Sequence, residues 1–528
     1  MTDGRSAGTS ARFTFWACAV IVIVSSLVLT HEISEPFWGI QDFNCVLHSI
    51  PARNFLKYGL VATRFMPTID TGDVPNGHFD FYVHHPPATT YLLALFFGIF
   101  GESEWAGRLL FALCAIGSAL LVFLIGKLYL GRFEAFACAL VFSLLPGIGY
   151  FGRMINHESP GLFFALLAFL FYCKFLKTRS RRAIILLYAS TVLGLLTSWQ
   201  DYLLPFAIAF HYFVWGKRPG ESRWKIIPLP VLTFTVFIAL LGYSLALVGD
   251  GSGSAIGGPI SAIFMLRIGS VAGPDKYFTF VEFLGRELAA LDNLFTPIVT
   301  YAAVAWLLIV VVERARGRRQ REHFDWLLLC FLAYGVLYLL VFKQQAYHHD
   351  YLLYYTAPVF AYASVLATRH LIGICLAPKL WVKVVAVVLL SYLFLATGLP
   401  RFVELHSNPP CDSWVELGKY LRRHIDSDEA IIVSWREGDL YTEYYSDREI
   451  TRGVVTLDQF QSALNESRNE AVVYMDTANT RASEELSDFL EANYIDMPIS
   501  VKGTDYVAYI MRIPKKYRSR RARARQAL

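Results

Sequence analysis

The sequence predicts a polytopic α-helical membrane protein with a small α/β domain at its C-terminal end, and two observations support this prediction. The chain of 528 residues is 55% hydrophobic and 17% charged, whereas a soluble domain is usually about one quarter charged. Long uncharged apolar runs fill residues 1–400 and are missing from residues 401–528. We therefore expect a transmembrane domain over 1–400, a soluble domain over 401–514 and a basic tail over 515–528.

The apolar runs predict the spanning helices. A helix needs about 20 apolar residues to cross a bilayer. By this rule about eleven segments qualify, at 13–30, 104–129, 133–150, 159–176, 183–199, 202–216, 226–248, 295–313, 325–342, 351–368 and 380–399. The first segment is too long for the core of a typical signal peptide, so we expect it to be retained.

A further apolar stretch, Ala88–Gly101, is short and follows two histidines and two prolines. If it does not cross, the basic clusters at 174–182, 217–225 and 314–321 fall on the same side as Arg5 and Arg12. Basic loops favour the cytoplasmic side. We therefore expect a cytoplasmic N-terminus and a juxtamembrane helix at 88–101 in the outer interface. The first loop, 31–103, and the C-terminal domain are then expected outside, in the periplasm or extracellular space.

The C-terminal region alternates helical and strand-like segments, which favours a small sheet with helices packed on it. Helices are predicted at 414–425, 439–445, 457–465 and 482–492, and strands at 430–434, 471–475, 498–502 and 506–513. No glycine-rich phosphate loop is present. A docking or lid domain is the expectation. The tail at 515–528 is expected to be either solvated or in contact with anionic lipid or polysaccharide.

Polar side chains are costly inside a membrane and usually mark a site. Here they do not run through the middle of the spans but collect at the expected outer ends. The candidates are Asp42, Arg64, His85, Arg108, Arg153, His157, Glu158, Lys343, His348, His349 and Asp350. Such a mixture suits a site that deprotonates a hydroxyl and holds a phosphate. It suits a permeation pathway less well, because that needs polar groups near the bilayer midplane.

The run His348–Asp350 is also a candidate metal site, but adjacent positions do not share a helix face. We expect no cofactor, with a divalent metal as the alternative.

Four segments in order, WGIQDFN, ARNFLKYGL, YVHHPPATTYLLALFFGIFGESEWAGRLL and YFGRMINHESPGLFF, resemble the C-type (GT-C) polytopic membrane glycosyltransferases. The resemblance is to the protein O-mannosyltransferase and lipid A aminoarabinose transferase superfamily and covers residues 10–220 well. It implies a GT-C fold and inverting transfer of a sugar from a polyprenyl-phosphate donor to an acceptor outside the membrane. Membrane lipids and a glycan, lipid or protein acceptor are the implied partners, with no nucleic acid.

The resemblance also implies residue roles. Asp42 matches the first-loop acid that serves as catalytic base or orients the acceptor, and Glu158 matches the second acid. Arg153, His85 and Arg108 match further motif positions. The chain departs from the mannosyltransferase pattern at two places: phenylalanine follows Asp42 where a second acid often stands, and Glu158 replaces an aspartate.

From the chemistry, we expect Asp42 to act as the base and Arg153, Arg64, Lys343 and His348 to be candidates for binding the departing phosphate. Glu158 is expected to be the second catalytic residue. The expected substrate site is completed by His85, His157, His349, Asp350 and Arg108. We expect the bacterial inner membrane as location. The alternatives are a flippase for lipid-linked sugars and a non-catalytic scaffold.

Overall fold

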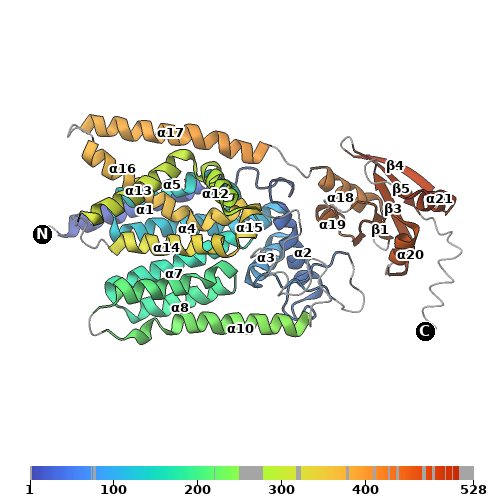
Figure 1. Cartoon of the computed structure of the whole chain (residues 1–528), viewed down its shortest axis with the longest axis horizontal. Coiled ribbons are helices and arrows are strands. Elements are labelled where there is room, and N and C mark those ends of the chain that lie inside the picture. Colours follow the sequence, from blue (N-terminus) through green and yellow to red (C-terminus); the bar gives the residue numbers. More distant parts are fainter. Residues whose placement is uncertain are drawn as a thin grey trace. The chain divides into compact units, whose positions relative to one another are not determined.

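The chain folds into two compact units, which are described separately (Figure 1). Unit 1 comprises Met1–Glu35, Phe65–Pro67 and Phe81–Asn408, and unit 2 comprises Pro36–Arg64, Thr68–Asp80 and Pro409–Leu528. The computed structural model describes residues 3–72, 74, 79–218, 221–248, 278–316, 323–375, 380–407, 412–425, 429–435, 439–466, 471–477, 482–493, 495–501 and 504–510. The predicted basic tail and most of the predicted loop at 249–294 lie outside these residues.

Unit 1 is a bundle of apolar helices. Within the described residues, seven helices are long and apolar enough to cross a membrane: α1 (Asp3–Leu29), α4 (Glu104–Tyr129), α7 (Glu158–Thr178), α10 (Pro228–Val248), α13 (Pro297–Ala315), α14 (His323–Val341) and α17 (Leu380–Ser407). The remaining predicted spans overlap α5 (Arg132–Leu144), α8 (Arg181–Leu195), α9 (Leu204–His211) and α16 (Ala357–Cys375), which differ from the predicted bounds. Helix α9 has only eight residues, and α16 begins at Ala357 instead of residue 351. The predicted span at 133–150 is interrupted after Leu144, because Pro146 begins a separate short helix, α6 (Pro146–Phe151).

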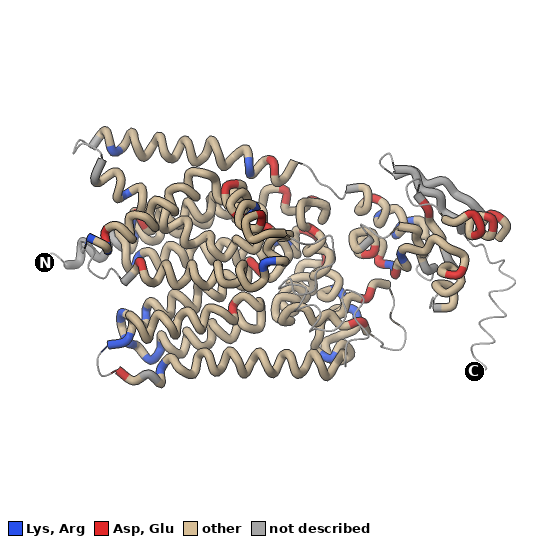
Figure 2. Tube along the Cα trace, in the orientation of Figure 1, with Lys and Arg blue, Asp and Glu red and all other residues tan. Residues whose placement is uncertain are grey.

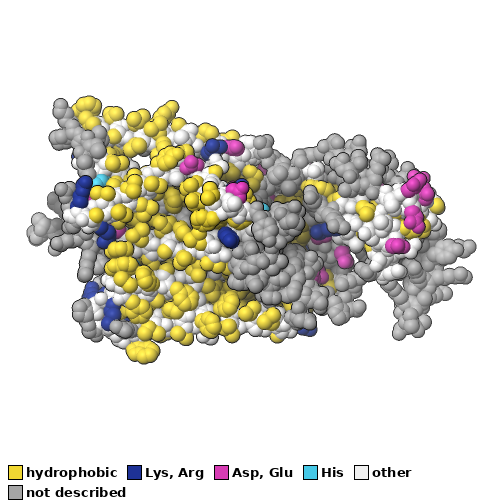
Figure 3. Space-filling model, viewed as in Figure 1, with side chains coloured by type: hydrophobic (Ala, Val, Ile, Leu, Met, Phe, Trp, Pro, Cys, Tyr) yellow, Lys and Arg dark blue, Asp and Glu magenta, His cyan; other side chains and the backbone are white. Residues whose placement is uncertain are grey.

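Hydrophobic side chains cover much of the face of unit 1 that Figure 3 shows. Only 6% of the apolar window is buried inside the protein in each of α10 and α17. Exposed Phe234 and Val231 on α10 and Trp381 and Val388 on α17 illustrate this. Such helices could not remain so exposed in water, and a bilayer supplies the apolar solvent they require. The chain is a multi-pass integral membrane protein.

Many lysine and arginine residues of unit 1 lie at one end of its helices (Figure 2). Lys177, in the last turn of α7, lies 4.5 Å from the centre of the Tyr129 ring at the end of α4. Arg179 donates to the carbonyl oxygen of Gly216 at 2.7 Å. Glu158, at the start of α7, therefore lies at the opposite end. The common basic end agrees with the charge argument from the sequence, while the side of the membrane on which it lies stays a prediction.

Unit 2 contains a five-stranded mixed sheet in the order β2-β1-β3-β5-β4. Its strands are β1 (Glu429–Val433), β2 (Ile450–Thr451), β3 (Ala471–Thr477), β4 (Ile495–Val501) and β5 (Thr504–Ile510). Strand β1 is parallel to β2 and β3, whereas β5 is antiparallel to β3 and β4. The predicted α/β character is confirmed, and the short β2 is an addition.

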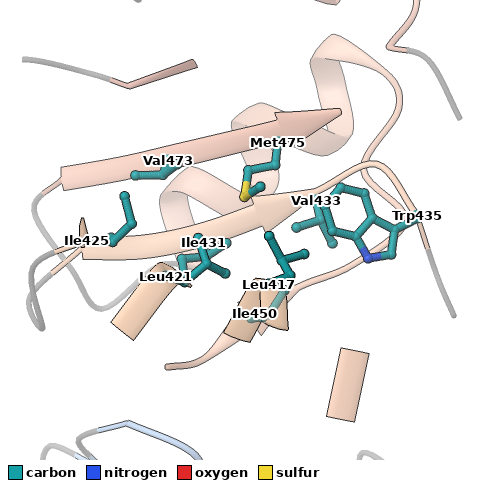
Figure 4. Close-up of a cluster of buried hydrophobic side chains, with 9 residues drawn as sticks. All are labelled: Leu417, Leu421, Ile425, Ile431, Val433, Trp435, Ile450, Val473 and Met475. Carbon is teal, nitrogen blue, oxygen red and sulfur yellow. The ribbon is translucent and has the colours of Figure 1, made fainter. Parts of the chain in front are cut away.

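Both faces of this sheet are covered because side chains alternate along each strand. Ile431 and Val433 of β1 face a core that includes Leu417 and Leu421 of α18 (Asp412–His424) (Figure 4). Ile432, between them, faces a second core. That core is closed by α20 (Leu457–Glu466) and α21 (Glu484–Asn493).

The first loop divides between the units. Its helix α2 (Phe43–Tyr58) groups with the C-terminal sheet in unit 2, whereas α3 (Ala88–Phe100) belongs to unit 1. The sequence analysis assigned all of 31–103 to the membrane domain. A local sequence pattern cannot show that a segment packs against residues several hundred positions away. The predicted end of that domain at residue 400 also differs, since α17 continues through Pro400 to Ser407.

Candidate functional site

Asp42 lies in unit 2 immediately before α2, and it is only 5% exposed. Its Oδ2 accepts a hydrogen bond from the Gly39 backbone N–H at 3.0 Å, and its Oδ1 accepts one from the Cys45 thiol, with Sγ at 3.2 Å. Gln41, the residue before it, has a φ of 64°. Non-glycine residues rarely adopt this conformation, and such strain often accompanies functional sites. The local fold therefore holds this carboxylate in a defined orientation.

Helix α2 fixes the segment that carries Asp42. Most of its side chains are buried, which is unusual for a helix in a surface loop. The Asn54 amide donates to the carbonyl oxygens of Thr68 and Asp70 at 3.0 and 2.8 Å. These hydrogen bonds hold the segment that follows α2 in the first loop against the helix. Arg64 lies in the exposed turn after α2 with a φ of 51°.

Glu158 is the second predicted acid and is the first residue of α7. It is 1% exposed, and within the described structure neither carboxylate oxygen receives a hydrogen bond. His157 Nε2 lies 3.1 Å from Oε1 without the geometry of a hydrogen bond. A helix N-terminus favours a carboxylate electrostatically, but burial without donors is costly. A buried carboxylate whose oxygens accept no hydrogen bond can bind a hydrogen-bond donor or a cationic group of a ligand.

The HHPP segment lies beside this acid. The His85 ring packs on the His157 ring with centroids 3.9 Å apart and an interplanar angle of 32°. The His84 carbonyl oxygen accepts a hydrogen bond from Trp199 Nε1 at 2.7 Å. Trp199 begins the short 3₁₀ helix η2 (Trp199–Tyr202). Three segments far apart in the sequence thus meet at one end of unit 1.

Arg153 and Arg108 are buried, and both donate to main-chain carbonyls of the segment that leaves α1. Arg153 Nη1 donates to His31, and Arg108 Nη1 donates to Glu35 and, at 3.2 Å, to Ile33. These contacts support a positioning role for both guanidinium groups. A role in binding phosphate stays a prediction.

The last predicted group lies on α15 (Lys343–His348) and the following 3₁₀ helix η6 (Asp350–Thr356). Lys343 and His348 are exposed, and His348 Nε2 lies 3.2 Å from the Gln344 side-chain nitrogen. The His349 ring lies 5.1 Å from Tyr351, which lies 5.8 Å from Phe151 of α6. The loop therefore lies at the same end of unit 1 as the segment containing Arg153.

Two neighbours of this group were missed from the sequence, Arg286 and Glu287 on α12 (Phe280–Phe295). Arg286 forms an ion pair with Asp350, with Nη2 3.1 Å from Oδ1. Burial, and more weakly Asp350, raise the pKa of Glu287 to about 7 against the opposing effect of Arg286. Burial likewise raises the pKa of Asp350. Two features of the sequence could have predicted α12: the helical spacing of apolar residues in 280–295, and the capping box formed by Thr279 and Glu282.

A buried polar network lies behind Glu158. The Tyr334 hydroxyl donates to Asp201 Oδ1 at 2.8 Å, and the hydroxyls of Ser198 and Tyr355 are 3.0 Å apart. Burial raises the pKa of Asp201 well above its ordinary value, against the opposing effect of the Tyr334 hydrogen bond. The network ties η2 to α14 and η6, and so connects the HHPP segment with the loop that carries Asp350.

The structure thus groups the candidates as follows. Unit 1 brings together His85, His157 and Glu158, and separately Lys343, His348, His349 and Asp350, while unit 2 holds Asp42 and Arg64. In the part of the chain that the structure describes, no three His, Cys, Asp or Glu side chains are arranged to hold a metal ion.

Comparison with known proteins agrees with the sequence resemblance. Residues 84–243 match the family described as dolichyl-phosphate-mannose-protein mannosyltransferase. This segment begins at the HHPP histidines and includes Arg153, His157 and Glu158. A search of curated protein sequences finds no significant match.

Solved structures share the fold at low sequence identity. ArnT from Cupriavidus metallidurans bound to undecaprenyl phosphate matches with a TM-score of 0.60 and 13% identity, over 95% of this chain and 98% of that one. The oligosaccharyltransferase AglB from Archaeoglobus fulgidus, in complex with an inhibitory peptide and a dolichol-phosphate, has a TM-score of 0.57 and 12% identity, over 96% and 75%.

The arabinofuranosyltransferase AftD from Mycobacteria gives a TM-score of 0.54 and 15% identity, over 95% of this chain and 40% of that one. All three are GT-C glycosyltransferases. The chain therefore has the fold of the GT-C membrane glycosyltransferases, and the resemblance seen in the sequence is confirmed.

Proposed function

We propose that this protein is an inverting glycosyltransferase that moves a sugar from a polyprenyl-phosphate donor to an acceptor on the non-cytoplasmic face of the membrane. The observation that carries the proposal is the fold match over nearly the whole chain to two transferases whose structures hold a polyprenyl phosphate. The buried, oriented carboxylates of Asp42 and Glu158 provide the chemical groups that such a reaction requires.

The proposed step is a single displacement. The oxygen of the acceptor hydroxyl attacks the anomeric carbon, the bond from that carbon to the phosphate oxygen breaks, and the polyprenyl phosphate leaves with the electron pair. Asp42 accepts the hydroxyl proton, as a general base that is held in place by Gly39 and Cys45. Inversion follows because the nucleophile and the leaving group lie on opposite sides of the carbon.

The leaving phosphate gains negative charge in this step and needs cations or N–H donors. Lys343 and His348 are exposed on α15, and Arg64 is exposed after α2, so these side chains suit the role. Glu158 and the stacked His85 and His157 are assigned to the sugar or to the acceptor, because an acid without donors can accept hydrogen bonds from hydroxyl or ammonium groups.

The flippase alternative would require charged groups at mid-membrane depth. The charged side chains that are buried in the described part of unit 1 lie in loops, near helix ends or on α12: Arg108, Arg153, Glu158, Asp201, Glu287 and Asp325. Because α12 is not among the candidate spans, this distribution favours the transferase.

The test is the transfer of label from a panel of polyprenyl-phosphate sugars in membranes that contain the protein. The wild type should move label to a lipid, glycan or protein fraction. Asp42→Asn should lower the rate about 10²- to 10⁴-fold, which is typical when a general base is lost. Asp458→Asn, an exposed acid of the same unit, is the matched control. Flux of the donor across vesicles without any transfer product would favour the flippase.

A further inference from the structure

The C-terminal domain packs on the helix that carries Asp42 at its start. Its helix α19 (Asp439–Ser446) contacts α2 within unit 2. Ahead of Asp42, the Phe37 backbone N–H donates to the Tyr445 hydroxyl at 2.7 Å, and Phe37 is fully buried. Just after Asp42, the Phe43 ring lies edge-on to Tyr441 with centroids 6.4 Å apart. The backbone on both sides of the acid is therefore held by α19.

A second set of contacts holds α2 further along. Arg53 Nη1 lies 2.9 Å from Asp447 Oδ1, and Nη2 donates to the Tyr444 carbonyl oxygen at 3.1 Å. The guanidinium carbon also lies 4.4 Å from the centre of the Tyr444 ring. The Arg53 and Asp447 side chains are 12% and 28% exposed. One arginine thus makes three different interactions with the end of α19, in a setting that is less screened than an exposed ion pair.

Asp447 is fixed on its own side of this contact. It follows the last turn of α19 with a φ of 53°, and its N–H donates to the Glu443 carbonyl oxygen at 2.8 Å. Burial alone would raise the pKa of its carboxyl, but Arg53, and more weakly Lys57, hold it below the ordinary value. The carboxylate is therefore charged and oriented toward α2 at neutral pH.

We propose that the C-terminal domain is a positioning element for the catalytic acid, and that Arg53 and Asp447 are its positioning residues. This inference rests on the proposed function. A helix is stiff between its ends, so the contacts of α2 at Phe43 and Arg53, with the Phe37–Tyr445 hydrogen bond just ahead of the helix, together fix the place of Asp42. Without the Arg53–Asp447 pair, α2 can rotate about its contacts at Phe37 and Phe43.

The test uses the full-length protein in vesicles and separates kcat from KM. Arg53→Ala and Asp447→Asn should each lower kcat about 10- to 100-fold, as expected when a catalytic group is displaced by about 1 Å, with the KM for the lipid donor unchanged. The double variant should be no slower than either single variant, because each removes the same interaction.

The matched control is Arg452→Ala. Arg452 pairs with Glu443 on the same α19 helix, an ion pair other than the one between Arg53 and Asp447. This variant should lower thermal stability while its kcat per folded molecule stays at the wild-type value. Equal kcat losses in Arg452→Ala and Asp447→Asn would overturn the proposal, because the domain would then matter only for folding. Fully additive losses in the double variant would also overturn it.

Amide hydrogen exchange in residues 43–58 distinguishes this inference from the proposed function. Asp447→Asn should speed exchange across α2 while leaving β1 and β3 protected. A wild type that transfers no sugar, with this exchange pattern intact, would overturn the proposed function while α19 still held α2. Unchanged exchange in α2 would overturn the positioning role whatever the activity.

Discussion

The Cys45 thiol donates to Asp42 Oδ1 at a distance of 3.2 Å, and its side chain is fully buried. The two residues are three positions apart at the start of α2, so that local helix geometry brings them together. The Cys45 thiol therefore orients the candidate base.

We expect Cys45→Ala to lower kcat by about 2- to 10-fold, because a hydrogen bond of this kind contributes roughly 0.5–1.5 kcal/mol. Cys45→Ser retains a donor and should keep most of the activity. The measurement is the initial rate of transfer at saturating donor, with Cys114→Ala in unit 1 as control. Equal rates for the alanine variant and the wild type would contradict a role for this thiol.

Glu158→Gln should separate activity from stability. In the described structure the buried carboxylate oxygens accept no hydrogen bond, and Oε1 lies 3.1 Å from His157 Nε2, so an amide of nearly the same size should fit the site at little cost. We expect thermal stability to stay equal or rise by roughly 1–2 kcal/mol while transfer falls about 100-fold. Thermal unfolding and the transfer assay check this, with exposed Glu102→Gln as control. A loss of stability with full activity would show that Glu158 is structural.

Substitution of Arg153 or Arg108 should lower the stability of the protein, in contrast to Glu158→Gln. Both buried guanidinium groups donate to carbonyls of residues 31–35, so Arg153→Ala and Arg108→Ala should each destabilise the protein by roughly 1.5–3 kcal/mol, the usual contribution of hydrogen bonds made by a charged group. Arg64→Ala, on an exposed turn, should leave thermal stability unchanged. If Arg153→Ala instead raised the KM of the donor at unchanged stability, binding of phosphate would be its main role.

The pKa of Glu287, raised from its ordinary 4.5 to about 7, predicts a pH dependence of stability. Between these values the folded state keeps the carboxyl protonated while the unfolded state releases the proton, so stability falls as pH rises from about 4.5 to about 7. Glu287→Gln should remove this slope. Thermal unfolding in detergent across this range tests it, and an unchanged slope would place the titration on another group.

Glu282 on the same helix serves as a contrasting control. Its hydrogen bonds with the Thr279 backbone and side chain lower its pKa. Its contribution to folding stability is therefore present at pH values above the ordinary pKa of a glutamate and is lost as the pH falls. Glu282→Gln should therefore alter stability with the opposite pH trend.

Local patterns were enough to locate most elements. Apolar runs of membrane-spanning length placed the helices of unit 1, because every backbone polar group in lipid must be paired within its own helix. Alternating and helical periodicities placed α18, α20, α21, β1 and β3 to within about two residues, the usual uncertainty of element ends. The motifs around His85, Arg153 and Glu158 likewise identified the GT-C fold, because each motif is a short contiguous run of residues.

The tertiary structure decided the relationships that span long stretches of chain. Arg53 and Asp447 are separated by 394 positions, and Arg286 and Asp350 by 64. No periodicity or spacing encodes such pairs, since each depends on how whole helices pack. The sequence by itself determined a membrane-embedded helical protein with acids and bases at one end of its helices. Only the packing of α2 on α19 decided that the first-loop acid belongs with the C-terminal domain, because burial of one helix against another is a property of the folded chain.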